Sequence, residues 1–187
     1  VEFIFQPAEE NEAGGRLMCE DGLFDLFTVE ALYGMHNQPG LPLGKFGLSA
    51  GPSMASADMF EITVTGKGSH AAHPHHGADP IVTGSEIVTA LQRIASRVTN
   101  PIEAAVVSVT QFHSGTNMNV IPETAVIKGT CRTLSRTVQD TVEVRLKEVA
   151  RGIAAAHGLT AEIVYDRRYP VLVNTAEETI KAVKAAI

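Results

Sequence analysis

The feature that most constrains this 187-residue chain is the order of elements expected between residues 56 and 172. Two amphipathic helical segments alternate there with four β-rich segments, in the order strand, helix, strand, strand, helix, strand. This order is typical of the split βαβ, ferredoxin-like fold, an antiparallel sheet with two helices on one face. Such a sheet leaves one face and an edge uncovered.

Hydrophobic periodicity places each of these elements. Residues 60–65 alternate apolar and polar side chains, which indicates a half-buried strand. Asp79 and Pro80 suit the start of a helix. Thr137 with Asp140 resembles a capping box, which would start the second helix. The other expected elements are strands over 104–112, 125–132 and 159–165 and helices over 80–98 and 138–157.

The N-terminal segment carries an acidic pair after a predicted strand. The apolar run Val1–Phe5 indicates a buried strand, which must end at Pro7 because proline cannot donate to a ladder. Glu9 and Glu10 follow. Neighbouring residues of an extended chain point opposite ways, so one carboxylate could hold a metal while the other handles a proton. The alternative is a solvated turn that opens a helix, where acidic residues suit the helix dipole.

The chain then returns toward this acidic pair. A helix is expected over 12–21, with Gly22 closing its C-terminal end, and a second strand over 28–35, with His36 at its end. A right-handed strand–helix–strand crossover brings the carboxyl ends of both strands to one edge of the sheet. His36 is therefore expected near Glu9 and Glu10, and His and Glu are ordinary ligands for divalent metals. A lone His after a strand is otherwise a surface or capping residue.

At these residues the chain resembles a known family. Its motifs are similar to those of the metal-dependent amidohydrolases of the aminoacylase/carboxypeptidase superfamily, and most of all to the hippurate hydrolase and auxin-conjugate hydrolase branch. The resemblance covers essentially the whole chain, and its motifs are specific in combination. They lie at Phe5–Glu10, Gly34–Asn37, Gly51–Asp58, Gly66–Ala72 and Asn119–Pro122.

The resemblance implies a division into domains. Residues 1–55 would form part of a parallel α/β catalytic domain, and residues 56–172 the family's lid and dimerisation domain. Residues 173–187 would return to the catalytic domain. The expected hinge is the stretch 45–58, which is rich in Gly, Ser, Ala and Pro. A homodimer that pairs through the lid follows as an expectation.

The resemblance also implies roles for the acidic pair and His36. Glu9 would be the general base that takes a proton from the attacking water and passes it to the leaving amine. Glu10 and His36 would bind metal in a site for two divalent ions, Zn, Mn, Co or Ni. Family members carry further ligands, a Cys-x-His pair and an Asp upstream and a His far downstream. This sequence has no Cys-x-His and no His beyond His157. We therefore expect an internal fragment that is inactive by itself.

Three residues of the expected lid match family positions that hold substrate. His70 would steady the tetrahedral oxyanion, and Asn119 and Arg132 would orient the carboxylate end of the substrate. Each has a plainer alternative. His70 lies in a loop with three other histidines and could belong to a solvated cluster. Asn119 could be a turn residue and Arg132 an exposed strand cation.

The expected activity is hydrolysis of the amide bond of a small N-acyl amino acid, such as hippurate or a related conjugate. Two alternatives remain open: a ferredoxin-like ligand-binding or dimerisation module without catalysis, and a dipeptidase of the same superfamily. The net charge of −6 and the absence of a basic cluster argue against nucleic acid as a partner. No apolar run approaches the length of a membrane span. Cys19 and Cys131 suit a reducing, cytoplasmic compartment and are both expected to be core residues.

Overall fold

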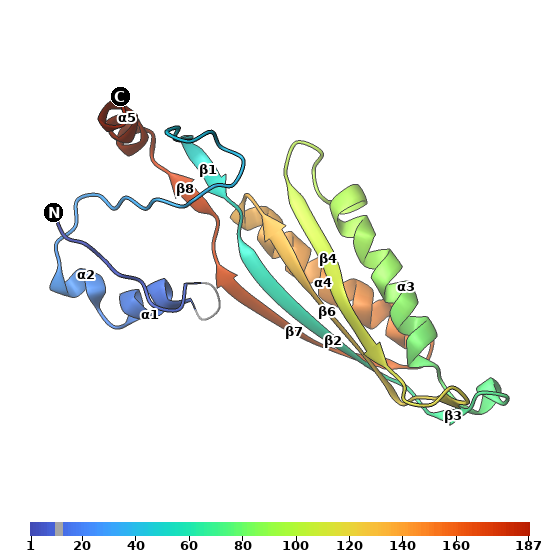
Figure 1. The fold of residues 1–187 in the computed structure, drawn as a ribbon. Helices are drawn as coiled ribbons and strands as arrows, with labels where there is room; N and C mark the ends of the chain where they lie inside the picture. Colours follow the sequence, from blue (N-terminus) through green and yellow to red (C-terminus); the bar gives the residue numbers. More distant parts are fainter. Residues whose placement is uncertain (10–12) are drawn as a thin grey trace. The chain divides into compact units, whose positions relative to one another are not determined.

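The computed structural model describes residues 1–9 and 13–187 (Figure 1). Contacts divide the chain into two compact units. The first comprises Val1–Gly51 together with Asn174–Ile187, and the second is Pro52–Val173. Within residues 1–9 and 13–187, no helix has both the length and the apolar character needed to cross a membrane.

The second unit is built on a four-stranded antiparallel sheet. Its strands are β2 (Ala57–Thr65), β4 (Ala105–Ser114), β6 (Thr124–Thr133) and β7 (Thr160–Tyr169), in the spatial order β4-β6-β2-β7. The helices α3 (Pro80–Arg93) and α4 (Arg136–Ala156) pack on one face of it (Figure 1). The ferredoxin-like fold class expected from the element order is therefore confirmed.

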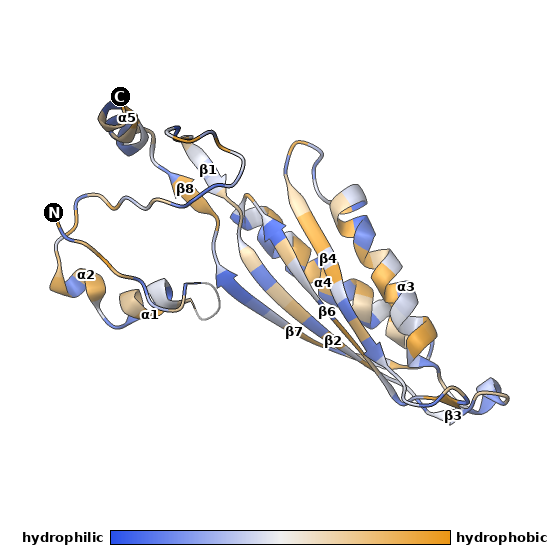
Figure 2. Ribbon diagram, in the orientation of Figure 1, coloured by the Kyte–Doolittle hydropathy of each residue, from blue (hydrophilic) through white to orange (hydrophobic). Residues whose placement is uncertain are grey.

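The core of this unit lies between the sheet and its two helices. Buried and more exposed positions alternate along β2 and β6, as expected for strands with one buried face, and Figure 2 shows both hydrophobic and hydrophilic residues along these strands. Each fully buried Leu or Ile side chain contributes about 1.5–3 kcal/mol relative to an exposed one. The fully buried side chains that meet in the core include Ile62 and Val64 of β2, Ile127 of β6, Ile87 and Leu91 of α3, and Val142 and Leu146 of α4.

Both long helices begin at a side-chain cap, though only one of the two caps was predicted. The carboxylate of Asp79 accepts hydrogen bonds from two backbone N–H groups in the first turn of α3, as expected. For α4 the expected Thr137–Asp140 capping box is wrong. The cap is Ser135, whose hydroxyl accepts from the backbone N–H three residues on, at 3.2 Å. Asp140 pairs instead with Arg167 on β7, at 2.6 Å.

Shorter elements complete the second unit and the connections. A π-helical turn, η2 (Ile94–Val98), ends α3, and β3 (Ser69–His70) pairs with β5 (Val120–Ile121) beyond one end of the large sheet. A 3-10 turn, η1 (Pro74–His76), follows β3. The chain enters the second unit through β1 (Gly51–Met54) and leaves it through β8 (Leu172–Asn174), and these two strands pair with each other.

The first unit contains helices but not the strands that the sequence predicts. Its helices are α1 (Gly14–Glu20), α2 (Leu23–Leu26) and α5 (Ala176–Ala185). Residues 1–5 and 28–35 form no strand, and their apolar side chains are exposed, Phe5 at 88%. A parallel strand needs hydrogen-bonded neighbours and cover on both faces. No sheet of the described residues includes either segment.

Two smaller expectations in the first unit have opposite outcomes. Gly22 directly follows the C-cap of α1 with φ 90°, a left-handed conformation that glycine adopts without strain, as predicted for the end of this helix. Cys19 is exposed, so the expectation that it is a core residue is wrong. Cys131, by contrast, is fully buried in the sheet, as expected.

We expect amide hydrogen exchange to separate the two units in the isolated chain. Residues 58–170 carry a continuous buried core, whereas in 1–50 the apolar side chains are largely exposed. Local opening costs less free energy where few apolar contacts must break. Exchange measured by mass spectrometry should show stronger protection in 58–170 than in 1–50. Equal protection in both ranges would contradict separate units.

Candidate functional site

The structure brings His70 and Asn119 together at one end of the second unit. This end, formed by residues 69–76 and 119–121 with β3, η1 and β5, is here called the tip. In the β3–β5 pair, His70 lies opposite Val120. The backbone N–H of Ala71 donates to the carbonyl oxygen of Asn119, at 2.9 Å. Two residues that are far apart in sequence are therefore fixed as neighbours by backbone hydrogen bonds.

A glycine permits the turn that leads the chain from β2 to the tip. A Cβ atom on Gly66 would lie 2.2 Å from the carbonyl oxygen of Ala78, closer than any side chain tolerates. The neighbouring Lys67 exchanges two backbone hydrogen bonds with Ala78, both at 2.9 Å. The Gly-Lys-Gly-Ser-His stretch thus makes a close backbone approach, which places His70 at the tip.

Hydrogen bonding fixes the tautomer of His70. The backbone N–H of Ala72 donates to Nδ1 of His70, at 3.1 Å. A backbone amide can only donate, so Nδ1 must carry a lone pair and the neutral ring carries its proton on Nε2. The side chain is exposed. His70 therefore presents an N–H donor, which is what stabilisation of a developing oxyanion requires.

The other histidines of the tip cluster around His70. Ring centroids lie 5.6 Å apart for His70 and His73, and 4.1 Å apart for His75 and His76. Close packing of rings does not make a metal site. Among the described residues, no group of three or more His, Cys, Asp or Glu side chains is arranged to hold a metal ion.

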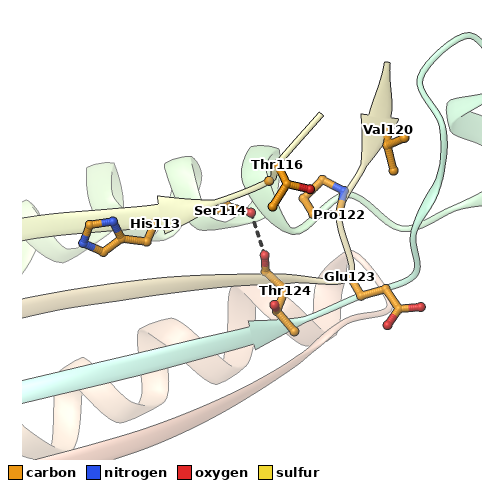
Figure 3. A pocket seen from close by; sticks show the side chains of 8 residues that line it. His113, Ser114, Thr116, Val120, Pro122, Glu123 and Thr124 are labelled. Carbon is orange, nitrogen blue, oxygen red and sulfur yellow. Dashed lines mark hydrogen bonds between the residues drawn. The ribbon is translucent and has the colours of Figure 1, made fainter. Parts of the chain in front are cut away.

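A shallow hollow of about 470 Å³ opens beside the tip (Figure 3). Two of its lining residues are hydrogen-bonded, since the hydroxyl of Ser114 donates to the carbonyl oxygen of Thr124, at 2.6 Å. The lining is mixed, with His113 and Glu123 among its polar residues and Val120 and Pro122 among its apolar ones. Its lining residues are His113, Ser114, Gly115, Thr116, Val120, Pro122, Glu123 and Thr124.

Arg132 lies at the opposite end of the sheet from the tip. It stands on β6 next to the buried Cys131, so its side chain leaves the face of the sheet that the helices do not cover. Eight steps of β6 separate Thr124, at the tip end, from Arg132, a distance of roughly 26 Å at about 3.3 Å per residue. One lid therefore cannot bring Arg132 and His70 to the same small molecule.

A buried carboxylate near Arg132 was missed by the sequence analysis. Asp58 is fully buried, and its carboxylate accepts hydrogen bonds from Gln139 at 2.8 Å and Tyr165 at 3.2 Å. Burial raises the pKa of this carboxyl, and the hydrogen bonds and the positive charge of Arg167 oppose that rise. The sequence could have indicated this buried carboxylate, because Asp58 falls in the same alternation along the strand as the buried residues Phe60 and Ile62.

The predicted metal and base residues lie in the first unit. Glu9 is exposed, and Glu10 lies outside the described residues. Nδ1 of His36 is 2.6 Å from the carbonyl oxygen of Asn37, which can only accept, so the neutral ring keeps the lone pair of Nε2 for a ligand. That arrangement is typical of a metal-binding histidine. With one such residue and no cluster of donors, however, the described residues do not fit a site for two metal ions.

Comparison with known proteins identifies the family of this chain. The profile of the M20 peptidase dimerisation domain matches residues 55–157, more than half of the chain. The chain belongs to the M20 family. The resemblance to metal-dependent amidohydrolases, stated above from the motifs, is therefore confirmed, and the matched residues lie within the ferredoxin-like unit.

Relatives and solved structures agree with this assignment. N-acetylcysteine deacetylase of Bacillus subtilis is 44% identical over 93% of this chain, and N-acetyldiaminopimelate deacetylase of Streptococcus sanguinis is 44% identical over 86%. The crystal structure of Bacillus subtilis YXEP, a dinuclear metal-binding M20 peptidase, superposes with a TM-score of 0.78 at 39% identity over 98% of this chain. This chain spans 45%, 43% and 45% of these three proteins, respectively.

Proposed function

We propose that the whole protein hydrolyses the amide bond of N-acyl amino acids, and that residues 56–172 act as its lid. Two relatives at 44% identity are named as deacetylases of N-acetylated amino acids, which supports this reaction class. The observation that carries the proposal is the tip, where the exposed Nε2–H donor of His70 stands beside Asn119. We propose residues 1–55 and 173–187 as parts of the catalytic domain.

Each site residue then has a defined task. Glu9 takes the proton of the attacking water and returns it to the leaving amine. The Nε2–H of His70 donates to the oxyanion that forms at the scissile carbonyl, a role worth about 10²–10³-fold in kcat for a single donor. Asn119 and Arg132 orient the substrate, and the guanidinium of Arg132 pairs with the carboxylate of the amino acid.

Two divalent metal ions, held in part by Glu10 and His36, belong to the proposal. The similarity to YXEP, a dinuclear metal-binding peptidase, supports them. Bound metal would polarise the scissile carbonyl and lower the pKa of the attacking water. The described residues form no such site, so the steps above concern only what this chain's own side chains do. Zn, Mn, Co and Ni all suit the proposed ligand types.

In a homodimer, the tip and Arg132 could both serve one substrate although they lie at opposite ends of the lid. A small N-acyl amino acid cannot reach across the roughly 26 Å of β6 between the tip and Arg132. If both ends serve one substrate, they must come from two chains. The match to a dimerisation domain supports this arrangement. We propose that the tip of one subunit completes the active site of its partner, in a cytoplasmic enzyme without nucleic-acid or membrane partners.

A dipeptidase is the second candidate, because YXEP is described as a peptidase. A substrate panel separates the two. The whole protein, supplied with divalent metal, is given N-acetyl amino acids, hippurate and dipeptides, and the released amino acid is quantified. We expect the best N-acyl substrate to exceed the dipeptides by at least about tenfold in kcat/KM, a difference of ~1.4 kcal/mol in transition-state binding.

The opposite preference would make the protein a dipeptidase. Hydrolysis that is lost with a chelator and regained with metal would support the metal-dependent class. No hydrolysis of any of these substrates, with or without metal, would favour a ligand-binding module instead.

A further inference from the structure

The hydroxyl of Thr130 lies between a backbone carbonyl and the guanidinium of Arg132. Its Oγ1 is 2.8 Å from the carbonyl oxygen of Asp58 and 2.8 Å from Nη1 of Arg132. A carbonyl oxygen only accepts and a guanidinium nitrogen only donates. The hydroxyl must therefore give its proton to Asp58 and accept from Arg132, so both hydrogen bonds have a fixed direction.

This arrangement orients one edge of the guanidinium. In the part of the chain that the structure describes, the two hydrogen bonds recorded for Arg132 both use Nη1, to Thr130 and to the carbonyl oxygen of Cys131 at 3.1 Å. The edge formed by Nε and Nη2 is left to a ligand. Two parallel N–H groups on one edge are what a carboxylate binds in a bidentate pair.

The hydrogen-bonded chain that runs from Arg132 through Thr130 ends at the backbone of Asp58, which is held firmly in place. Asp58, the second residue of β2, has a fully buried carboxylate that Gln139 and Tyr165 hold by hydrogen bonds. Its neighbour Ser56 is tied to Thr133 by backbone and hydroxyl hydrogen bonds of 2.8–3.1 Å. The carbonyl that receives the proton of Thr130 is therefore fixed by the core.

We propose that Thr130 is a positioning residue for substrate recognition, which holds Arg132 so that its Nε–Nη2 edge meets the carboxylate of the N-acyl amino acid. This inference rests on the function proposed above. Thr130 itself does not touch the substrate. Its contribution is to keep a long, flexible side chain in the one orientation that accepts a carboxylate, which lowers the entropic cost of binding.

The test compares Thr130→Val with Thr130→Ser in the whole, metal-supplied protein. Valine keeps the shape and removes the hydroxyl, whereas serine keeps the hydroxyl. Thr110→Val is the matched control, because the hydroxyl of Thr110 also faces a sheet carbonyl, that of Lys128 at 3.5 Å, with no recorded contact to an arginine among the described residues. Two substrates are used, an N-acyl amino acid and the same compound with its carboxylate replaced by a carboxamide.

We expect Thr130→Val to raise KM for the carboxylate substrate by about tenfold, the loss of one charge-assisted hydrogen bond, with little change in kcat. The carboxamide should be hydrolysed as by the wild type. Thr130→Ser should restore most of the KM, and Thr110→Val should change neither substrate. In an Arg132→Ala background, Thr130→Val should have no further effect.

Other outcomes overturn the inference in distinguishable ways. Equal losses on both substrates, or no rescue by serine, would show that Thr130 only supports the sheet. If Arg132→Ala lowers kcat/KM for the carboxylate substrate while Thr130→Val behaves like the Thr110 control, the role of Arg132 stands and that of Thr130 fails. If Arg132→Ala leaves the preference for the carboxylate unchanged, the proposed role of Arg132 fails and this inference falls with it.

Discussion

Glu9→Gln should lower kcat of the whole protein by about 10²–10⁴-fold, the range that a positioned general base contributes. The amide of glutamine has nearly the same shape as the carboxylate but cannot take a proton from water at neutral pH. Because the neighbouring Glu10 and His36 are the proposed ligands, the metal content should not change. Steady-state kinetics and metal analysis of the purified protein provide the two measurements.

Glu30→Gln is the matched control for this prediction. Glu30 is an exposed glutamate in the same unit, with no role proposed in the site. The substitution removes the same charge and should leave kcat within about twofold, as surface changes away from a site usually do. Loss of metal together with activity in Glu9→Gln would instead make Glu9 a ligand, and unchanged turnover would remove it from the mechanism.

The ferredoxin-like unit could be predicted because its strands and helix starts are specified by residues close together in the sequence. The alternation Phe60, Ile62, Val64 sets which face of β2 is buried, and Asp79 caps its helix through contacts within one turn. Residues 1–5 and 28–35 carry an equally apolar pattern and yet form no strand. An apolar run specifies only that a strand can form. Its ladder partners must come from other segments, and local patterns do not identify them.

The site was predictable in its residue types but not in its arrangement. The family resemblance pointed to His70, Asn119 and Arg132, but their spacing in sequence did not show that the first two are neighbours and the third lies at the far end of a strand. The β3–β5 pairing, which puts His70 opposite Val120 and so beside Asn119, is a long-range contact between two short strands. The capping residue Ser135 was missed because Thr137 and Asp140 match the capping-box pattern, whereas Ser135 has Val138 three residues on and does not match it.

The largest effect is expected from mixing two inactive variants, His70→Ala and Glu9→Ala. A twofold dimer is the commonest oligomer symmetry. If the tip of one subunit serves its partner's site, a mixed dimer has one site with an intact Glu9 and an intact His70, and a second site that lacks both. Equal mixing with free exchange makes half of the dimers mixed. Activity should therefore return to about one quarter of the wild-type value, from two nearly inactive parents.

The structure supplies both a negative and a positive control for this experiment. His70 and Asn119 lie side by side on one tip, so mixing His70→Ala with Asn119→Ala leaves every tip defective and should restore nothing. Arg132 lies at the far end of the sheet, so it and the tip would reach one substrate from different chains. Mixing His70→Ala with Arg132→Ala should therefore restore activity. If no pair recovers although mixed dimers are shown by mass spectrometry, His70 acts within its own chain and the proposed dimeric site is wrong.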